Sequence, residues 1–193
     1  GLIPLVNVST HKDWIDEFHQ CDKIEFDKVI DAELHPNSGE IKMAEVINRI
    51  SEVTDGAAIV ITDVGQHQMV ANRYYKFRKS LSCITSGGLG TMGFALPSAM
   101  GAKVGQPERT VIAVIGDGGF QMTIQELGTI RQSDLAVKIL ILNNNFLGMV
   151  RQWQQLFFEK RYSFTELDNP DFQMITRGYG IKAQKVEKRE NLD

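Results

Sequence analysis

Three clusters in the sequence hold residue types that could bind a metal ion or an anion. They are Asp63-Val64-Gly65-Gln66-His67-Gln68, Gly116-Asp117-Gly118-Gly119, and Asn143-Asn144-Asn145 ahead of Gly148. In the second cluster an acid is followed at once by two glycines, so a carboxylate can hold a hard cation while bare backbone N–H groups approach an anion. Mg2+ takes few protein oxygens and completes its octahedron with phosphate oxygens and water. The clusters predict a metal site with Asp117 as one ligand and Asn144 as a second.

Each cluster also has a simpler explanation when it is considered alone. An acid in the position of Asp117 commonly caps a following helix. A run of Asn residues such as 143–145 commonly forms a turn. The occurrence of all the clusters in one chain favours the metal-and-phosphate site over these separate explanations.

A further glycine-rich segment, residues 86–93, matches the dinucleotide-binding pattern GxGxxG through Gly88, Gly90 and Gly93. It follows a short apolar run, and Asp117 lies further along the chain where such a motif has its ribose-binding acid. A nicotinamide dehydrogenase or a nucleotide-binding module is therefore an alternative prediction. Against it, a ribose-binding acid needs neither two glycines after it nor an Asn run after the next strand.

The elements that must position these clusters alternate between strand and helix patterns. Short, continuous apolar runs predict strands at 57–62, 83–85, 111–115 and 137–142, and helical patterns lie near 91–104 and 122–132. This alternation predicts an α/β fold, a mostly parallel sheet with helices on both faces. In such sheets ligands bind at the carboxyl ends of the strands, where all three polar clusters fall.

The flanking segments complete the predicted organisation. Residues 1–37 form a lead-in with one short helical pattern around Trp14, Ile15 and Phe18. Ser38 is the expected N-cap of a helix of roughly 15 residues, and residues 38–193 are expected to form one domain. The charged end, residues 187–193, looks like the start of another helix.

Composition narrows the classes of function. The 193 residues are 42% hydrophobic and 23% charged, with a net charge of -3 and no basic run, so we expect no nucleic-acid partner. Cys21 and Cys83 fit neither a zinc nor a disulfide pattern, which favours a reducing cytoplasm. No apolar run is long enough to span a membrane, and the start lacks the features of a signal peptide. We therefore do not expect glycosylation at the pattern Asn7-Val8-Ser9.

Several motifs in the chain resemble those of thiamine diphosphate (ThDP) enzymes. GDG at 116–118, followed after 24 residues by Asn143-Asn144, looks like the ThDP motif. GQHQM at 65–69, TSGGLGTMG at 85–93, ILILNN at 139–144 and GMVRQWQQLF at 148–157 resemble the C-terminal domain of acetohydroxyacid (acetolactate) synthase catalytic subunits. The resemblance spans about residues 38–180, and it implies the fold known as the diphosphate-binding domain.

The resemblance assigns roles to individual residues. It implies that Mg2+ is held by Asp117, the side chain of Asn144 and the backbone carbonyl of Phe146. It further implies cofactor contacts for Gly65, Gln66, His67, Gly90, Met92, Gly118, Gly119, Gly148 and Met149, with Met149 and Trp153 bordering the 2-ketoacid pocket. The simpler roles are a packing or surface position for His67, core filling for Met92, and a buried aromatic anchor for Trp153.

The resemblance also implies a function for a larger protein. That function is ThDP-dependent decarboxylation of a 2-ketoacid and carboligation, as in branched-chain amino-acid biosynthesis, with pyruvate oxidase or glyoxylate carboligase as alternatives. In this family the catalytic Glu and part of the FAD site lie in other domains, and Glu126 of this chain is better explained as a helix-surface acid. We therefore expect partners in N-terminal domains, a second catalytic subunit and a regulatory subunit, and we expect the chain alone to be inactive.

Overall fold

The computed structural model describes residues 3–5 and 9–192. The chain divides into two compact units, Gly1–Gly39 and Glu40–Asp193. Asn7 and Val8 of the glycosylation pattern lie outside the described residues. In the described ranges, no helix combines the length and apolar character that crossing a bilayer requires.

The first unit is helical. Its elements are η1 (Ile3–Leu5), α1 (Lys12–Glu25), a π-helical turn η2 (Phe26–Ile30) and α2 (Asp31–Leu34). Helical backbone therefore runs from Lys12 to Leu34, much further than the short pattern predicted around Trp14, because no Gly or Pro interrupts the chain before Pro36. None of the described side chains of α1 is buried.

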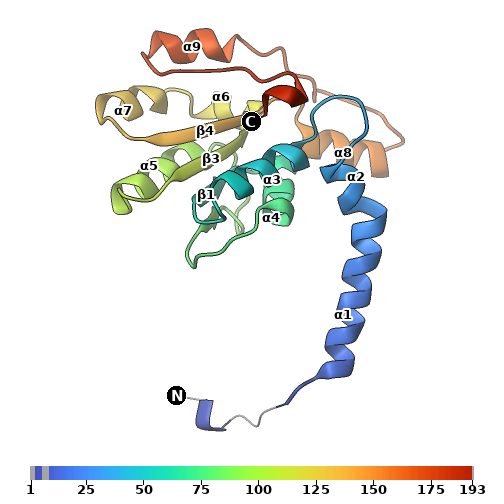
Figure 1. Ribbon diagram of the computed structural model, residues 1–193. Coiled ribbons are helices and arrows are strands. Elements are labelled where there is room, and N and C mark those ends of the chain that lie inside the picture. The colour runs from blue at the N-terminus through green and yellow to red at the C-terminus, as the bar shows by residue number, and fades with distance from the viewer. Residues whose placement is uncertain (1–2, 6–8, 193) are drawn as a thin grey trace. The chain divides into compact units, whose positions relative to one another are not determined.

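The second unit is built on a sheet of four parallel strands in the order β2-β1-β3-β4 (Figure 1). The strands are β1 (Ile59–Thr62), β2 (Cys83–Thr85), β3 (Val111–Gly116) and β4 (Val137–Leu142). Register pairs Val60 with Cys83, Ile59 with Val111, and Val111 with Val137. The predicted α/β class with a parallel sheet is confirmed, and all four predicted strands are present.

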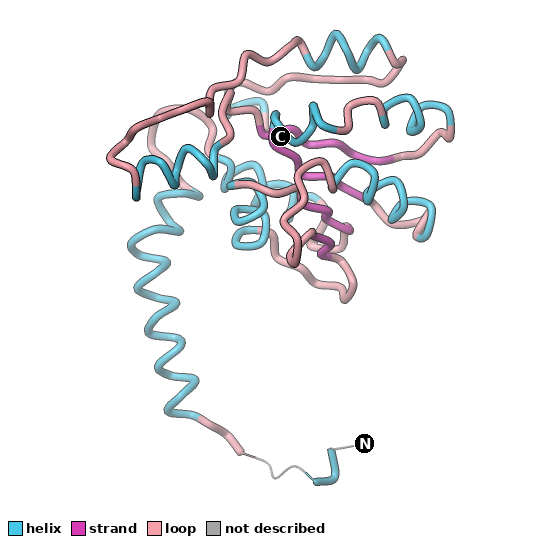
Figure 2. Tube along the Cα trace, turned by 180° about the vertical axis from the view of Figure 1, so that it is seen from behind, coloured by secondary structure: helices cyan, strands magenta, loops and turns pink. Residues whose placement is uncertain are grey.

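Alternating side chains of β1 and β3 face two helical layers. The odd-numbered residues, such as Ile61 and Ala113, belong to one buried cluster with side chains of α5 (Ala95–Gly105), α6 (Asp117–Met122) and α7 (Glu126–Gln132). On the other face, α4 (Gln66–Tyr74) packs on β1 and β3, and α3 (Met43–Val53) packs on α4. Figures 1 and 2 show these helices on either side of the strands.

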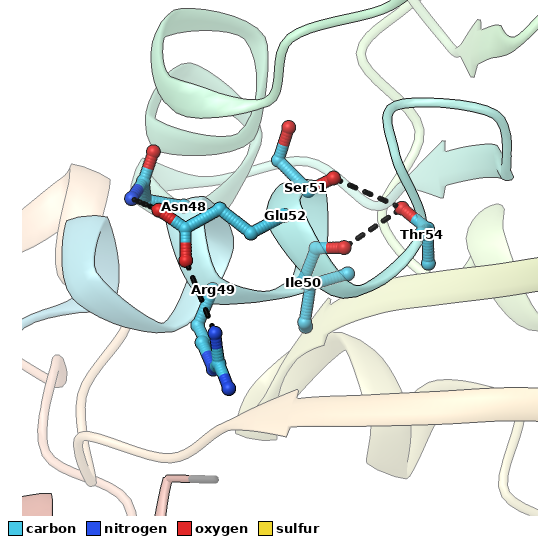
Figure 3. Close-up of polar contacts among 6 residues, drawn as sticks. All are labelled: Asn48, Arg49, Ile50, Ser51, Glu52 and Thr54. Carbon is cyan, nitrogen blue, oxygen red and sulfur yellow. Dashed lines mark hydrogen bonds and ion pairs between the residues drawn. The ribbon is translucent and has the colours of Figure 1, made fainter.

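Helix α3 begins later than the sequence suggests. The predicted N-cap at Ser38 is wrong, because the first turn is closed by a capping box in which the backbone N–H of Lys42 donates to Glu45 at 2.8 Å. The helix has 11 residues instead of roughly 15. At its end, the hydroxyl of Thr54 donates to the carbonyl of Ile50 at 2.7 Å (Figure 3). The Thr54 and Tyr75 hydroxyls are also 2.7 Å apart, which ties α3 to the end of α4.

Three other boundaries differ from prediction. The helix predicted near 91–104 is α5, which begins only at Ala95 because the chain first turns at Gly90 and Gly93, both with positive φ. The pattern at 122–132 is divided between α6 and α7. Beyond β4, the chain forms α8 (Gly148–Phe157) and α9 (Phe172–Gly178), and its charged end holds only a 3-10 turn, η3 (Arg189–Asn191).

Candidate metal and diphosphate site

Asp117 follows directly after β3, one of the two inner strands of the sheet, and so lies at its carboxyl end. Asp117 is 2% exposed and is the first residue of α6, whose N-cap is Gly116. Its Oδ2 accepts a hydrogen bond of 2.7 Å from Nδ2 of Asn169, from a loop far along the chain. The simpler explanation of Asp117 as the cap of the next helix therefore does not fit, because its carboxylate bonds to Asn169.

The loop after β4 brings amide and carbonyl oxygens to the same edge. Asn143 and Asn144 each accept a hydrogen bond of 3.1 Å from the backbone two residues on, so the predicted turn does form. The loop also pairs with residues 165–167, since Leu147 N–H donates to Thr165 and Leu167 N–H donates to Asn145. In this antiparallel pattern Phe146 and Glu166 are a pair without mutual hydrogen bonds. The carbonyl of Phe146 therefore points away from residues 165–167.

His67, in the first turn of α4, has a buried nitrogen without a partner. The side chain is only 7% exposed, and its Nε2 has no hydrogen-bond partner within the described part of the chain. Burial lowers the pKa of His67 to about 4, although a hydrogen bond to the backbone of Asp63 acts in the opposite direction. The ring lies against Gly65 and Gly116, where an added Cβ would meet it at 2.7 and 3.0 Å. The simpler role of a surface histidine is therefore wrong.

The buried, neutral His67 predicts a pH dependence of stability. Because its pKa in the folded chain is below the ordinary 6.5, its contribution is complete above pH 6.5 and is lost as the pH falls towards 4. The full shift corresponds to roughly 3 kcal/mol. Between pH 7 and 4, the free energy of unfolding should fall by up to that amount more in the wild type than in His67→Gln, as measured by urea denaturation. Asp63, whose pKa burial raises, has the opposite effect but is present in both proteins. Parallel curves for the two proteins would contradict the assignment.

Asp63, which opens the first polar cluster, has a structural role. It is fully buried, and its carboxylate accepts hydrogen bonds from the backbone N–H groups of Val64 at 2.7 Å and Gly93 at 3.0 Å. An added Cβ on Gly119 would lie 2.6 Å from its Oδ2. Asp63 therefore holds the loop between β2 and α5 close to Gly119 of α6. Its carboxylate oxygens are already hydrogen-bonded to backbone N–H groups.

A cavity of about 50 Å³ lies at this edge of the sheet. All the residues to which the resemblance assigns a role line it, except Gly90 and Trp153. The apolar lining also includes residues to which the sequence assigned no role in the site, namely Met43, Val64, Leu142 and Leu147. These four have no sequence signal beyond that of ordinary core residues. The fold therefore gathers the segments after β1, β2, β3 and β4 around one small space.

Two of the predicted site residues lie outside this cavity. Gly90 has φ +61 and donates its N–H to the carbonyl of Ser86 at 2.9 Å. Trp153, on α8, is 56% exposed and packs its ring on that of Phe157, 4.9 Å between centroids. The simpler role of Trp153 as a buried anchor is therefore wrong for this chain.

The oxygen donors fit a magnesium ion with a phosphate group. Asp117, Asn144 and Phe146 all line the cavity, and Asp117 is its only carboxylate. Among the described residues there is no group of three His, Cys, Asp or Glu side chains that could enclose a metal by themselves. A site with one carboxylate and neutral oxygens leaves coordination positions for phosphate oxygens and water, as Mg2+ prefers. His67 lines the same space. Its ring donates to the backbone of Asp63, so the unpartnered Nε2 of the neutral ring carries a lone pair and donates to an anion only after it gains a proton.

The topology excludes the dinucleotide-binding alternative. In that fold the glycine-rich turn and the ribose-binding acid follow neighbouring strands. Here the glycine-rich segment follows β2 and Asp117 follows β3, and β1 lies between these strands. The dehydrogenase prediction is therefore wrong.

The fold and the cavity together define a parallel α/β domain with a small, partly polar cavity at the carboxyl edge of its sheet. Residues 63–193 match the family described as "Thiamine pyrophosphate enzyme, C-terminal TPP binding domain", thiamine pyrophosphate being another name for ThDP. The chain belongs to this family, as its motifs predict.

Curated relatives agree with the resemblance to acetolactate synthases. The chain is 48% identical over 158 residues to the acetolactate synthase large subunit of Lactococcus lactis, covering 81% of this chain and 28% of that protein. It is 48% identical over 149 residues to the isozyme 2 large subunit of Escherichia coli (77% and 27%). It is 53% identical over 156 residues to the mitochondrial acetolactate synthase of Schizosaccharomyces pombe (79% and 23%). The chain thus spans about a quarter of the length of these relatives.

Proposed function

We propose that this chain is the cofactor-binding part of a ThDP-dependent acetolactate synthase. The observation that carries the proposal is the convergence of Asp117, Asn144, Phe146 and His67 on one cavity at the carboxyl edge of the sheet. Membership of the TPP-binding family and identities of 48% to 53% to proteins named acetolactate synthase support it.

Mg2+ is held by the carboxylate of Asp117, the amide oxygen of Asn144 and the backbone carbonyl of Phe146. The pairing of the loop with residues 165–167 supports the third ligand, since it turns the Phe146 carbonyl away from that segment. A backbone ligand also tolerates a phenylalanine at this position, because the side chain takes no part in the coordination.

The diphosphate lies beside the metal, against His67, Gln66 and the first turn of α6. The backbone N–H groups of Gly118 and Gly119 belong to that turn and have no acceptor within the helix. His67 borders this site, where the charge of a bound diphosphate would favour a proton on Nε2 and so a hydrogen bond to the anion. The side-chain amide of Gln66 donates to the side-chain oxygen of Gln152 at 2.9 Å. This bond links the start of α4 to α8, the helix that follows Asn144 and Phe146.

When bound, ThDP supplies the chemistry that decarboxylates a 2-ketoacid and joins the remainder to a second carbonyl compound. The residues of this chain fix the charged end of the cofactor, and the apolar side chains of Met92 and Met149 exclude water from the adjoining wall. The cavity of about 50 Å³ can hold an ion and its ligands, whereas pockets for whole organic ligands are about 300 to 1,000 Å³. The remainder of the site, including the catalytic Glu and the FAD site, therefore belongs to other domains and to a second catalytic subunit.

The proposed substrates are small 2-ketoacids, and a regulatory subunit is a further proposed partner. The relative in Schizosaccharomyces pombe is named as mitochondrial, so the cytoplasmic location expected from the cysteine content stays a prediction.

Product analysis of the full-length enzyme tests the proposed function. Pyruvate, ThDP and Mg2+ should give CO2 and acetolactate, and the reaction should need both additions. Oxygen consumption with pyruvate, or activity with glyoxylate alone, would identify one of the alternative ThDP enzymes and overturn the proposal.

Trp153 is expected to govern the choice of the second 2-ketoacid. With pyruvate and 2-ketobutyrate in competition, Trp153→Ala should change the product ratio by about tenfold or more, since one methylene in an apolar pocket is worth about 1 to 3 kcal/mol. ThDP binding should be unchanged, because Trp153 lies outside the cavity. Leu156→Ala, which also removes an exposed apolar side chain from α8, is the matched control. An unaltered ratio in Trp153→Ala would reduce this residue to a packing role.

A further inference from the structure

The side chain of Asn169 joins the ends of the two strands that carry the proposed metal ligands. Its Nδ2 lies 2.7 Å from Oδ2 of Asp117, and 3.0 Å from Oδ1 of both Asn143 and Asn145. Its own oxygen accepts a hydrogen bond of 2.8 Å from Nε2 of Gln121 on α6. One half-buried amide therefore contacts α6 on one side and the β4 loop on the other.

The orientation of this amide is fixed by its neighbours. Because an ionised carboxylate can only accept, the NH2 group of Asn169 must face Asp117, and its oxygen is then left to accept from Gln121. Within the described part of the chain, Asn169 supplies the only side-chain hydrogen bond to Asp117. A donor to one carboxylate oxygen restricts the rotation of the carboxylate, while the second oxygen is left for other partners.

The segment that carries Asn169 is itself bound to the β4 loop. Residues 165 and 167 pair with Leu147 and Asn145 through backbone hydrogen bonds of 2.8 and 2.9 Å. The guanidinium of Arg151 lies between the rings of Phe146 and Tyr162, 4.0 and 4.2 Å from their centroids. Asn169 thus projects from a segment whose position relative to Phe146 is fixed, and its amide sets how far the Asp117 carboxylate lies from that loop.

We propose that Asn169 is a positioning residue for the metal, which holds the Asp117 carboxylate at the spacing from Asn144 and Phe146 that Mg2+ requires. This inference rests on the proposed function. Mg2+ demands near-ideal octahedral geometry, whereas Ca2+ accepts a flexible arrangement of oxygens. Loss of a positioning residue should therefore weaken the binding of Mg2+ more than the binding of Ca2+. A general loss of protein stability should weaken the binding of both ions equally.

The test measures ThDP binding to the full-length enzyme as a function of Mg2+ and, separately, of Ca2+. Asn169→Ala should raise the half-saturating Mg2+ concentration by about 10 to 100-fold, as is typical for residues that orient metal ligands. The half-saturating Ca2+ concentration should rise less. Asn169→Leu, a side chain of similar size that has no donor, replaces the alanine variant if that protein does not fold.

Gln154→Ala is the matched control. Gln154 is another amide that binds the same segment, through two hydrogen bonds to the backbone of Ser163 at 3.0 and 3.1 Å, but it does not contact Asp117. Gln154→Ala should leave the ratio of the half-saturating Mg2+ concentration to the half-saturating Ca2+ concentration unchanged. An unchanged Mg2+ requirement in Asn169→Ala, or equal increases for Mg2+ and Ca2+, would overturn the inference. Failure of the proposed function itself would show separately, as Mg2+-dependent ThDP binding that survives Asp117→Ala.

Discussion

Asp117→Ala in the full-length enzyme is expected to abolish the Mg2+ dependence of ThDP binding. Among the described residues that line the cavity, Asp117 has the only carboxylate, so its loss removes the negative charge that this lining offers to the metal. The metal in turn neutralises the diphosphate, so the two ligands should bind cooperatively and be lost together. The loss should exceed the about 10 to 100-fold that is typical of residues that only orient ligands.

Calorimetric titration with Mg2+ and ThDP, each in the presence of the other, measures this loss. Asp168→Ala is the control, because Asp168 is an exposed acid beside Asn169 that does not line the cavity. It should bind both ligands as the wild type does. Unchanged Mg2+ and ThDP binding in Asp117→Ala would show that the site is assigned wrongly.

The second large effect concerns the 193-residue chain by itself, which we expect to fold but not to turn over pyruvate. In the resembled family the cofactor is activated by a Glu of another domain, and acid–base assistance of this kind is typically worth about 10² to 10⁴-fold. The loss should be greater still, because the cavity of about 50 Å³ leaves the reactive part of the cofactor in water.

Release of CO2 and formation of acetolactate from pyruvate, with saturating ThDP and Mg2+, measure the activity of the chain. The melting temperature supplies the control for binding, because ligands that bind only the folded state raise it by mass action. We expect ThDP and Mg2+ to raise the melting temperature slightly without any turnover of pyruvate. Acid–base assistance is worth about 10² to 10⁴-fold, so its absence should cost at least that much activity. Turnover within about tenfold of that of the intact enzyme would therefore place the proton transfer inside this chain.

The strands could be predicted because burial on both faces leaves a simple signal. β4 has the predicted bounds, and β1 and β3 differ by at most two residues, since continuous apolar runs in this size range suit strands of a parallel sheet. Helix starts were predicted less well. Ser38 has a common N-cap side chain, but the capping box that forms uses the backbone of Lys42 with Glu45, and the side chain of Lys42 gives no sequence signal for that role.

Much of the cavity could be predicted because parallel strands bring their carboxyl ends to one edge. The sequence therefore predicts that the motifs after β1, β3 and β4 lie close together, even though the conformations of the loops are not known from it. Asn169 could not be found in this way, since it lies 52 residues from Asp117 in a loop with no strand of its own. An Asn before a Pro is also typical of an ordinary turn. The exposure of Trp153 depends on how α8 packs, which a helical pattern alone does not indicate.

Asp117, Asn144 and Phe146 are proposed to bind the metal of a ThDP site. The most direct test is an anomalous difference map from crystals of the full-length enzyme grown with ThDP and Mn2+ in place of Mg2+. One peak should lie about 2.1 Å from a carboxylate oxygen of Asp117, from the amide oxygen of Asn144 and from the backbone carbonyl of Phe146. A metal peak bound by other residues, with the cofactor diphosphate beside it, would show that Asp117, Asn144 and Phe146 are not the metal ligands.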